Sequence, residues 1–503
     1  MNILFLPLDE RPCNYMYPKE LALLTNDLEL ITPDLSILGS KKKSANLEAI
    51  LDFVEHNISK CDAFVFSIEM LFFGGLLPSR LHHYDSQHKI NMMNRLKQLR
   101  SISTCKFYAF QLIMRCPRYN SNDEEPDYYE YYGQDLFYRS YLLDKKERLS
   151  LEQSELDALH SLNSHIPNEI IHDYELRRSY NIGLNLDILQ LLKDGFIDYL
   201  SIPHDDSCEF GYTALDQKKV VHYISTNRLF NKVLMYPGAD EAGCELISRA
   251  YNESINKVTK VYPFYSSYLG PTIVPLYEDR IMIESLKSHL LVSHCQIVEN
   301  KDDADFILAI NSPGKFMQEA FNQDLRDITY SSYRNLKFFV DTLKQDIDNG
   351  KKVVVADCAY ANGGDLELIS YLDEAKILDR LYAYRGWNTH CNTLGTTISQ
   401  MVMCQSPNLN ELELKKNLMV HILEDGFYQA AIRKKVTGQL PMELNYFDLK
   451  DQQKVVSAIV SKELLEMYHK EILHSFKNER ISCLKITHPW NRMFEIGVEL
   501  CLS

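Results

Sequence analysis

The sequence predicts an α/β protein with more than one domain. Short apolar, β-rich runs alternate with amphipathic helical patterns over most of the chain, which is typical of βαβ units with parallel sheets. Charged and amide residues directly follow several of these runs, as expected where parallel strands end at a ligand-binding edge. At 503 residues, the chain is too long for one ordinary hydrophobic core.

The first block, residues 1–259, predicts a (β/α) domain whose parallel sheet is either open or barrel-like. Its candidate strands are residues 2–8, 28–31, 63–68, 106–112, 197–202 and 232–236. Helical patterns between them cover residues 45–56, 89–99 and 184–192. Residues 118–148 interrupt the alternation with tyrosines and acidic residues, and we expect a long loop or lid there.

The second block, residues 260–405, predicts a smaller, Rossmann-like α/β domain. Its candidate strands are residues 261–265, 296–298, 306–310, 353–356 and 381–384. Helical patterns cover residues 281–291 and 335–348, and Gly350 is the expected stop of the second helix. Residues 406–503 are mostly helical in pattern and close with β-like runs at 481–486 and 490–499.

The composition is that of a soluble globular protein, with 45% hydrophobic and 24% charged residues. The formal net charge of −15 argues against a nucleic-acid partner and against an anionic membrane surface. No apolar run approaches the ~20 residues of a transmembrane helix. The short apolar run at the N-terminus has no basic segment before it, so we expect no signal peptide.

The 12 cysteines are scattered and include no Cys-x-x-Cys pair. This spacing argues against a disulfide framework and against a structural zinc site. A reduced, cytoplasmic setting is therefore predicted.

Two adjacent carboxylates, Asp205 and Asp206, follow the β-rich run at 197–204. Aspartate is depleted inside strands, so we expect both residues where the strand ends. Two carboxylates held close together do not ionise independently, and one pKa rises. A protonated carboxyl beside an ionised one suits general acid/base catalysis, so this pair is the predicted catalytic centre. The alternative is a surface loop with two solvated acids.

Charged residues follow other strands of the first block. They are candidate substrate-binding residues: Asp9, Glu10, Arg11, Arg80, Arg115, Asp240 and Glu241. The arginines suit substrate oxygens or a bidentate carboxylate pair. A salt bridge within the first loop is an equal alternative for Arg11, and a buried Glu69–Arg80 pair is favoured for Glu69. Asp240 and Glu241 equally suit the first turn of a helix.

The second block adds a further set of candidate substrate-binding residues: Asp357, Asn362, Asp365, Trp387, Asn388 and Asn392. Trp387 beside two amides suits a sugar, because the ring face stacks on C–H groups while amides bind hydroxyls. A phosphate would suit the following helix N-terminus instead. The structural alternative is an elaborate helix cap.

No cofactor is predicted, but a divalent metal is an alternative. The residues that would supply nitrogen and oxygen ligands are His204, Asp205, Asp206, Asp240 and Asp357. No His-x-His or His-Glu-x-x-His spacing supports such a site, so we favour metal-free acid/base chemistry.

The opening run Leu6-Pro7-Leu8-Asp9-Glu10-Arg11-Pro12 resembles the signature of a bacterial domain-of-unknown-function family. The resemblance extends nearly end to end and implies no particular activity. The other matching motifs are Gly74-Gly75-Leu76, Ser79-Arg80, Asp205-Asp206 with Gly211, Pro237-Gly238-Ala239-Asp240-Glu241, Asn362-Gly363-Gly364-Asp365, Gly386-Trp387-Asn388-Thr389 and Asn392-Thr393-Leu394-Gly395.

The aspartate pair is also similar to the catalytic pair of substrate-assisted β-N-acetylhexosaminidases, which have a (β/α)₈ barrel. This local similarity implies that Asp205 orients the acetamido group of the substrate and that Asp206 is the acid/base.

The favoured function is hydrolysis of a small polar substrate, most specifically by a glycoside hydrolase that uses the aspartate pair. One alternative is a metal-dependent hydrolase of a small or phosphorylated metabolite. Another is a non-catalytic two-domain ligand-binding protein. The expected partner is a small-molecule or carbohydrate substrate, with no nucleic acid and no membrane; the sequence does not define the oligomeric state.

Overall fold

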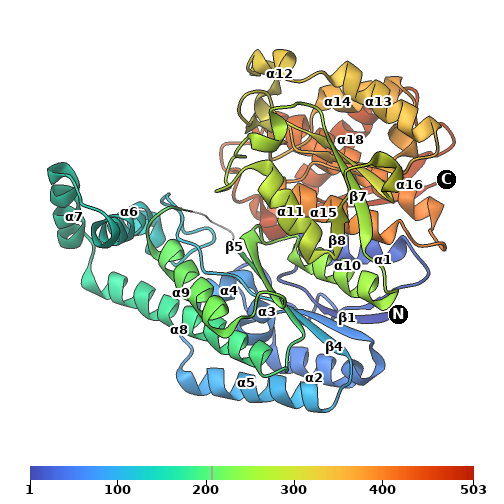
Figure 1. The fold of residues 1–503 in the computed structure, drawn as a ribbon. Coiled ribbons are helices and arrows are strands. Elements are labelled where there is room, and N and C mark those ends of the chain that lie inside the picture. The colour runs from blue at the N-terminus through green and yellow to red at the C-terminus, as the bar shows by residue number, and fades with distance from the viewer. Residues whose placement is uncertain (205–207) are drawn as a thin grey trace. The chain divides into compact units, whose positions relative to one another are not determined.

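The computed structural model describes residues 1–204 and 208–503, which form two compact units (Figure 1). Unit 1 comprises residues 1–10 and 30–246, and unit 2 comprises residues 11–29 and 247–503. The boundary therefore falls between Glu10 and Arg11, inside the opening motif. The predicted domain limits at 259/260 and 405/406 stay a prediction.

Unit 1 is built on a sheet whose strands are β1 (Asn2–Leu6), β2 (Glu29–Ile31), β3 (Ala63–Ser67), β4 (Lys106–Phe110), β5 (Tyr199–His204) and β6 (Val233–Pro237). The strand order is β2-β1-β3-β4-β5-β6, and the neighbours from β1 to β6 pair in parallel. All five residues of β3 are buried, as expected for a parallel strand covered on both faces. This strand order is that of doubly wound sheets. The predicted α/β class with parallel sheets is confirmed.

The helices of unit 1 are α2 (Leu47–Asn57), α3 (Ile68–Phe73), α4 (Leu76–Leu81), α5 (Ser86–Ser101), α6 (Tyr129–Arg148), α7 (Gln153–His165), α8 (Asn168–Lys193) and α9 (Tyr212–Asn227). Helix α10 (Ala242–Ser254) crosses the boundary between the units.

The prediction of a long loop over residues 118–148 is wrong for most of that segment. Residues 129–148 form α6, a 20-residue helix. Its buried residues include Tyr129, Gly133, Leu136, Phe137 and Ser140, and this spacing places them on one face of the helix. Tyrosine and glycine at two of these positions conceal the apolar period in the sequence, because neither is a typical aliphatic core residue.

Unit 2 begins with α1 (Pro12–Leu23) and contains a second parallel sheet. The sheet strands are β7 (Thr259–Tyr265), β8 (Cys295–Ile297), β9 (Phe306–Asn311), β11 (Val353–Asp357) and β13 (Ala383–Arg385). Their order is β13-β11-β9-β7-β8, with every adjacent pair parallel. The order therefore reverses between β7 and β9, as in doubly wound folds.

The remaining elements of unit 2 surround and extend this sheet. They are α11 (Met282–Val292), β10 (Gln318–Glu319), α12 (Thr329–Ser332), α13 (Leu336–Asp348), β12 (Tyr360–Ala361), α14 (Leu366–Glu374), α15 (His390–Met403), α16 (Glu411–His421), a π-helix (Ile422–Ile432), α17 (Arg433–Thr437), α18 (Gln453–Glu471), β14 (Ile481–Thr487) and β15 (Gly497–Leu502). One hydrophobic cluster joins the sheet, through Val353 and Val355, to Leu418, Phe427 and Val460 of the C-terminal helices.

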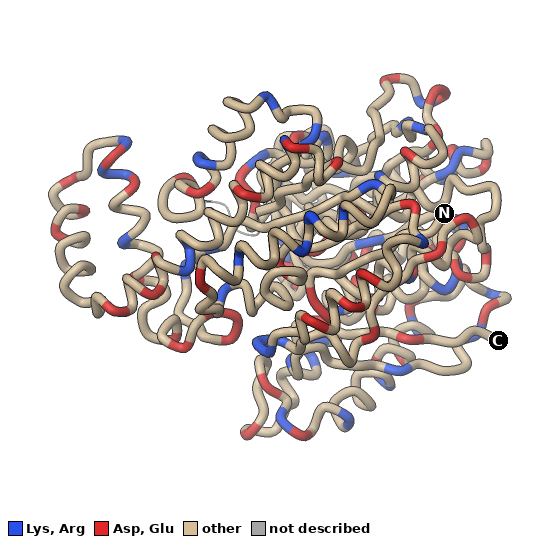
Figure 2. Tube along the Cα trace, turned by 90° about the horizontal axis from the view of Figure 1, so that it is seen from below, with Lys and Arg blue, Asp and Glu red and all other residues tan. Residues whose placement is uncertain are grey.

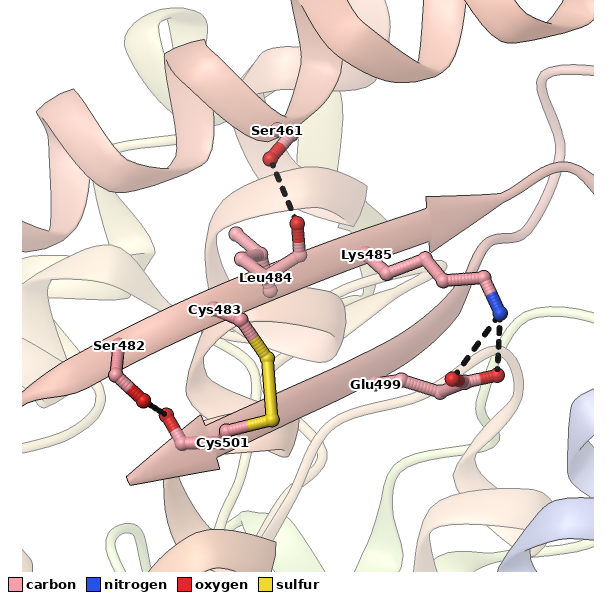
Figure 3. Close-up of a disulfide and its surroundings, with 7 residues drawn as sticks. All are labelled: Ser461, Ser482, Cys483, Leu484, Lys485, Glu499 and Cys501. Atoms are coloured by element: carbon pink, nitrogen blue, oxygen red, sulfur yellow. Dashed lines mark hydrogen bonds and ion pairs between the residues drawn. A yellow bond between two sulfur atoms is a disulfide. The ribbon is translucent and has the colours of Figure 1, made fainter. Parts of the chain in front are cut away.

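A disulfide joins Cys483 of β14 to Cys501 of β15 (Figure 3). The two strands are antiparallel, and the two cysteines face each other in the register. Lys485 and Glu499 form an ion pair across the same hairpin. The sequence argued against a disulfide framework, and this bridge was not expected. It was not visible in the cysteine spacing because the register of the hairpin, and not a cysteine motif, brings the two thiols together.

Basic and acidic residues are interspersed along the trace of the chain (Figure 2). Within the described residues, no helix is both long and apolar enough to cross a membrane.

Candidate functional site

The carboxyl end of the unit-1 sheet carries a series of acidic residues. Asp9 and Glu10 follow β1, Glu69 follows β3, and Asp240 and Glu241 follow β6. Ligands in open α/β sheets bind outside the carboxyl ends of strands, at the point where strand order reverses. In this sheet that point lies between β1 and β3. Asp205 and Asp206 follow β5 in the sequence and lie outside the described residues.

Glu69 is the best-defined carboxyl group at this edge. Its side chain is buried, with Oε1 accepting from the Leu112 N–H at 2.7 Å and Oε2 accepting from the Ser67 hydroxyl at 3.1 Å. Burial raises the pKa of Glu69 to about 7, although these hydrogen bonds and the charge of Arg80 act in the opposite direction. The group therefore exchanges a proton near neutral pH, which a general acid or base requires.

Glu69 also lines a small cavity of about 20 Å³ whose wall is partly polar and partly apolar. Arg80, Arg115, Asn181 and Asn185 contribute to the same wall. A cavity of this size holds about one water molecule where polar groups line it. A carboxyl group next to such a space has the position that a group activating water needs.

Arg80 and Arg115 form a compact ion-pair cluster with two acids that precede α6. Arg115 Nε and Nη2 lie 2.8 Å from Glu125 Oε1 and Glu124 Oε2, respectively. Arg80 Nη1 lies 3.4 Å from an oxygen of each glutamate. Both arginines are thus compensated by protein carboxylates, and the cluster fixes the chain after β4. Their predicted contact with substrate stays a prediction.

The acids beside the other strand ends have local contacts. Glu10 Oε1 accepts from the Lys41 N–H at 2.7 Å. Glu241 is buried, and its Oε2 accepts from the Ala239 N–H at 3.1 Å just before α10. Asp9 and Asp240 are also buried. These acids are held at the sheet edge rather than extended into solvent.

Arg11 belongs to unit 2, where its Nη1 lies 3.9 Å from Glu495 Oε2. Its guanidinium carbon stands 4.7 Å from the ring centroid of Trp490. One ion-pair partner of Arg11 therefore comes from the C-terminal segment, and the predicted alternative of a salt bridge within the first loop stays a prediction.

In unit 2, Asp357 and Asp365 belong to one buried network at the carboxyl ends of β9 and β11. Asn311 Nδ2 donates to Asp357 Oδ1 at 2.9 Å and to Asp365 Oδ2 at 3.1 Å. Arg334 Nη1 lies 2.6 Å from Asp365 Oδ2, and the Tyr384 hydroxyl donates to Asp357 Oδ2 at 2.8 Å. Burial, and then the charge of Asp365, raises the pKa of Asp357 to about 7. Arg334 offsets the charge of Asp365 through their buried ion pair.

The predicted loop residues of unit 2 have structural contacts. Asn362 has a φ of 58°, and its Nδ2 donates to Glu319 Oε2 at 2.9 Å. Asn388 has a φ of 60° and accepts from the Asn362 N–H at 2.8 Å. Asparagine tolerates this left-handed backbone conformation better than most residues. The main-chain hydrogen bond from Asn362 to the Asn388 carbonyl thus connects the loops after β11 and β13.

Trp387 is 1% exposed and packs edge-on against Tyr17 of α1, with ring centroids 6.0 Å apart. Asn392 and Thr389 form a capping box at the start of α15. The helix-cap alternative therefore describes Asn392 in this structure, while sugar stacking by Trp387 stays a prediction.

A buried charged cluster that sequence reasoning missed surrounds the start of the π-helix. His421 Nδ1 lies 3.2 Å from Asp425, its Nε2 lies 3.4 Å from Glu20, and Arg385 contacts the same ring. Burial and the neighbouring charges of Asp425 and Glu20 raise the pKa of Glu424 well above its ordinary range. The only sequence signal was the acid pair at 424–425 inside an apolar helical run; π-helical segments are frequent at functional sites.

Two groups within unit 2 have a metal-binding donor set: Glu278, His390 and Cys391, and His421, Glu424 and Asp425. The donor atoms in each group lie within 4.8 Å of one another. Arg385 beside His421 opposes a cation in the second group. In the first group, Glu278 lies 3.1 Å from His390 Nδ1, and the buried His390 Nε2 has no hydrogen-bond partner among the described residues. The Glu278 group is therefore the better candidate.

Together, the fold and these sites define an α/β protein with two parallel sheets and buried carboxyl groups at the carboxyl ends of their strands. Residues 3–499 match a family described as proteins of unknown function, DUF4127. The chain belongs to this family, which confirms the family resemblance predicted from the opening motif. No protein with a curated description matches the chain.

Proposed function

We propose that this protein is a hydrolase of a small polar substrate and that the reaction takes place at the carboxyl end of the unit-1 sheet. The observation that carries the proposal is Glu69, a buried carboxyl group with a pKa of about 7 beside a small cavity lined by the segments that follow β3 and β4. Acid/base hydrolysis needs a group that gains and loses a proton near the working pH.

The most specific form of the proposal is a glycoside hydrolase. Asp205 and Asp206 follow β5 of the same sheet in the sequence, so this pair would supply two further carboxyl groups for acid/base catalysis. In the substrate-assisted form, Asp205 orients the acetamido group and Asp206 protonates the leaving oxygen. Glu69 would then position water or a substrate hydroxyl.

The test is a screen of the full chain against aryl glycosides, including N-acetylhexosaminides and 6-phosphorylated sugars, with and without EDTA. We expect turnover that resists EDTA and falls roughly a thousandfold in Asp205→Asn and Asp206→Asn. Asp52→Asn, at an exposed position on α2, is the matched control and should leave turnover unchanged. Full activity in both active-site variants would exclude the aspartate pair as the catalytic centre.

A metal-dependent hydrolase is the second candidate, because Glu278, His390 and Cys391 form a compact donor set. It predicts bound metal in the purified protein and turnover that EDTA abolishes. His390→Gln should then remove the metal, as measured by elemental analysis, whereas retained metal would rule this group out as the binding site.

A further inference from the structure

The donor set of Glu278, His390 and Cys391 joins two segments of unit 2 that lie far apart in the sequence. Glu278 belongs to the loop 266–281 between β7 and α11, whereas His390 and Cys391 begin α15. Glu278 Oε1 accepts from the Cys391 N–H at 2.8 Å, and the Ser285 hydroxyl of α11 donates to Glu278 Oε2 at 3.1 Å. The Glu278 carboxylate therefore already ties the loop to the start of α15.

His390 contributes a buried ring of which one nitrogen is unpaired within the described residues. Its side chain is 0% exposed, and Nδ1 lies 3.1 Å from Glu278 Oε2. Nε2 is also buried and has no hydrogen-bond partner in this part of the chain. A metal-binding imidazole uses one nitrogen for the ion and the other for a hydrogen bond, often to a carboxylate. Because buried polar atoms are nearly always paired, the two nitrogens of His390 match this division of roles.

The distances within the donor set suit one tetrahedral ion. A carboxylate oxygen, an imidazole nitrogen and the thiol sulfur all lie within 4.8 Å of one another. Zinc bonds of about 2.0 to 2.3 Å to such ligands place the ligand atoms roughly 3.3 to 3.8 Å apart. Small side-chain rotations therefore bring the three donors onto one ion. Three protein ligands leave a fourth position, which water takes in sites of this kind.

The types and charges of the donors favour zinc over harder divalent cations. Mg²⁺ and Ca²⁺ take oxygen ligands, whereas a thiolate together with an imidazole suits zinc. Cys391 binds as the thiolate, so its proton passes to solvent as the sulfur–zinc bond forms. One thiolate and one carboxylate then balance the two positive charges of the ion, as a buried site requires. Within the described residues, the one ion pair of Glu278 is with His390, so no lysine or arginine competes with the ion.

We propose that Glu278, His390 and Cys391 bind a zinc ion that fastens the loop 266–281 to the start of α15. The inference rests on the metal-dependent candidate function for the location of the ion, and it adds the identity of the ion and the segment that the ion holds. Zinc binding and loop protection are measured without substrate, so their outcome is separate from any hydrolase activity.

The first test expresses the full chain in medium supplemented with Zn²⁺, Co²⁺ or Mg²⁺ and dialyses the purified protein against metal-free buffer. We expect about one Zn²⁺ or Co²⁺ per chain by elemental analysis and no retained Mg²⁺. Bound Co²⁺ should show the near-ultraviolet absorption of thiolate-to-cobalt charge transfer. Protein without Zn²⁺ and Co²⁺, or with Co²⁺ but without that absorption, would overturn the proposal. The test needs no variant, so it does not depend on whether a substituted chain folds.

Variants then assign the ligands. Cys391→Ser should abolish the charge-transfer absorption, and His390→Gln should weaken Co²⁺ binding by at least the roughly tenfold to hundredfold that loss of an outer-shell partner costs. Competition with a chelator gives the affinities. Cys404→Ser is the matched control, since Cys404 is a buried cysteine directly after the same helix and forms no disulfide. An absorption that survives Cys391→Ser, or that Cys404→Ser removes equally, would refute the assignment.

The loop supplies an independent readout, because Tyr268 and Tyr277 are exposed and chymotrypsin cleaves after tyrosine. With free zinc at about ten times its Kd, cleavage within 266–281 should slow roughly tenfold relative to chelator-treated protein. Cleavage after Tyr131, an exposed tyrosine of unit 1, is the control and should not change. Equal cleavage of the loop with and without zinc would overturn its attachment by the ion.

The results separate this inference from the metal-dependent candidate function. Bound zinc together with turnover that resists EDTA would support the zinc site and exclude the metal-dependent hydrolase. Turnover that EDTA abolishes, in a chain whose metal content is unchanged by Cys391→Ser and His390→Gln, would overturn the zinc site and leave the metal requirement in place.

Discussion

Glu69 illustrates how one side chain acquires its chemistry from its surroundings. It lies beside an apolar run in the sequence, and an isolated carboxylate there is costly to bury. The fold offsets part of that cost with the Leu112 N–H and the Ser67 hydroxyl. The remaining penalty raises its pKa, which is why the same group is both a structural bridge from β3 to the chain after β4 and a candidate acid/base.

The raised pKa of Glu69 predicts a pH-dependent loss of stability. The folded state keeps the proton up to about pH 7, whereas the unfolded chain releases it near 4.5. The folded state thus binds more protons between these values, and the free energy of unfolding falls as pH rises through that window, by about 3 kcal/mol in total. Glu69→Gln should remove this contribution.

The measurement is urea unfolding of the wild type and of Glu69→Gln at a series of pH values from 4 to 8. The difference between their unfolding free energies should change by about 3 kcal/mol across the window. Glu48→Gln, at an exposed position on α2, should show no such trend. A constant difference between wild type and Glu69→Gln would mean that the carboxyl titrates at its ordinary pKa.

At the scale of elements, the β14–β15 hairpin is a two-stranded sheet whose strands are joined by a disulfide. It pairs two strands only, and a two-stranded hairpin is marginal without further support. The disulfide closes a loop with a sequence separation of 18, and Ser461 of α18 donates to the Leu484 carbonyl of β14 (Figure 3). The bridge thus constrains the chain that closes the unit-2 core.

Replacing both cysteines, in Cys483→Ser/Cys501→Ser, should lower the free energy of unfolding of unit 2 by about 3 kcal/mol. Chemical denaturation under non-reducing conditions gives the value. The same experiment with Cys61→Ser is the control, since Cys61 is a partly exposed cysteine of unit 1 that forms no disulfide. Identical unfolding of wild type and double variant would show that the hairpin is held by its packing alone.

At the scale of the whole molecule, the residues that make up unit 2 can be compared with the predicted domain limits at 259/260 and 405/406. Residues 406–503 share one hydrophobic cluster with the second sheet, with Leu418, Phe427 and Val498 packed in the same core as Val353. α1 belongs to this unit too, although it is separated from the rest by more than 200 residues of chain. A fragment of residues 260–405 would expose much of that cluster to water.

We therefore predict that the isolated fragment 260–405 does not fold cooperatively. Thermal unfolding followed by circular dichroism should show a broad, non-cooperative change, while the full chain shows a sharp transition. A sharp transition in the fragment would support the three-part division predicted from the sequence and would show that the C-terminal segments are dispensable for the second sheet.

Much of the fold could be predicted because its signals are local. Every candidate strand of the two sheets corresponds to a strand, from β1 at residues 2–6 to β13 at residues 383–385, since continuous apolar runs define buried parallel strands. The same pattern predicted which acidic residues stand at strand ends, namely Asp9, Asp240 and Asp357. Helix α6 was missed because tyrosine and glycine occupy two positions of its buried face and conceal the apolar period.

The sequence alone therefore determined the α/β class, the family and the residues that stand at strand ends, because these depend on short-range periodicity and on contiguous motifs. The tertiary structure alone decided the strand order and the division of Glu10 and Arg11 between the two units. It alone also revealed the Asp357–Asp365 network, the His421 cluster and the Cys483–Cys501 bridge. Each of these depends on strand pairing or on contacts between separate elements, and no local pattern records which elements will meet.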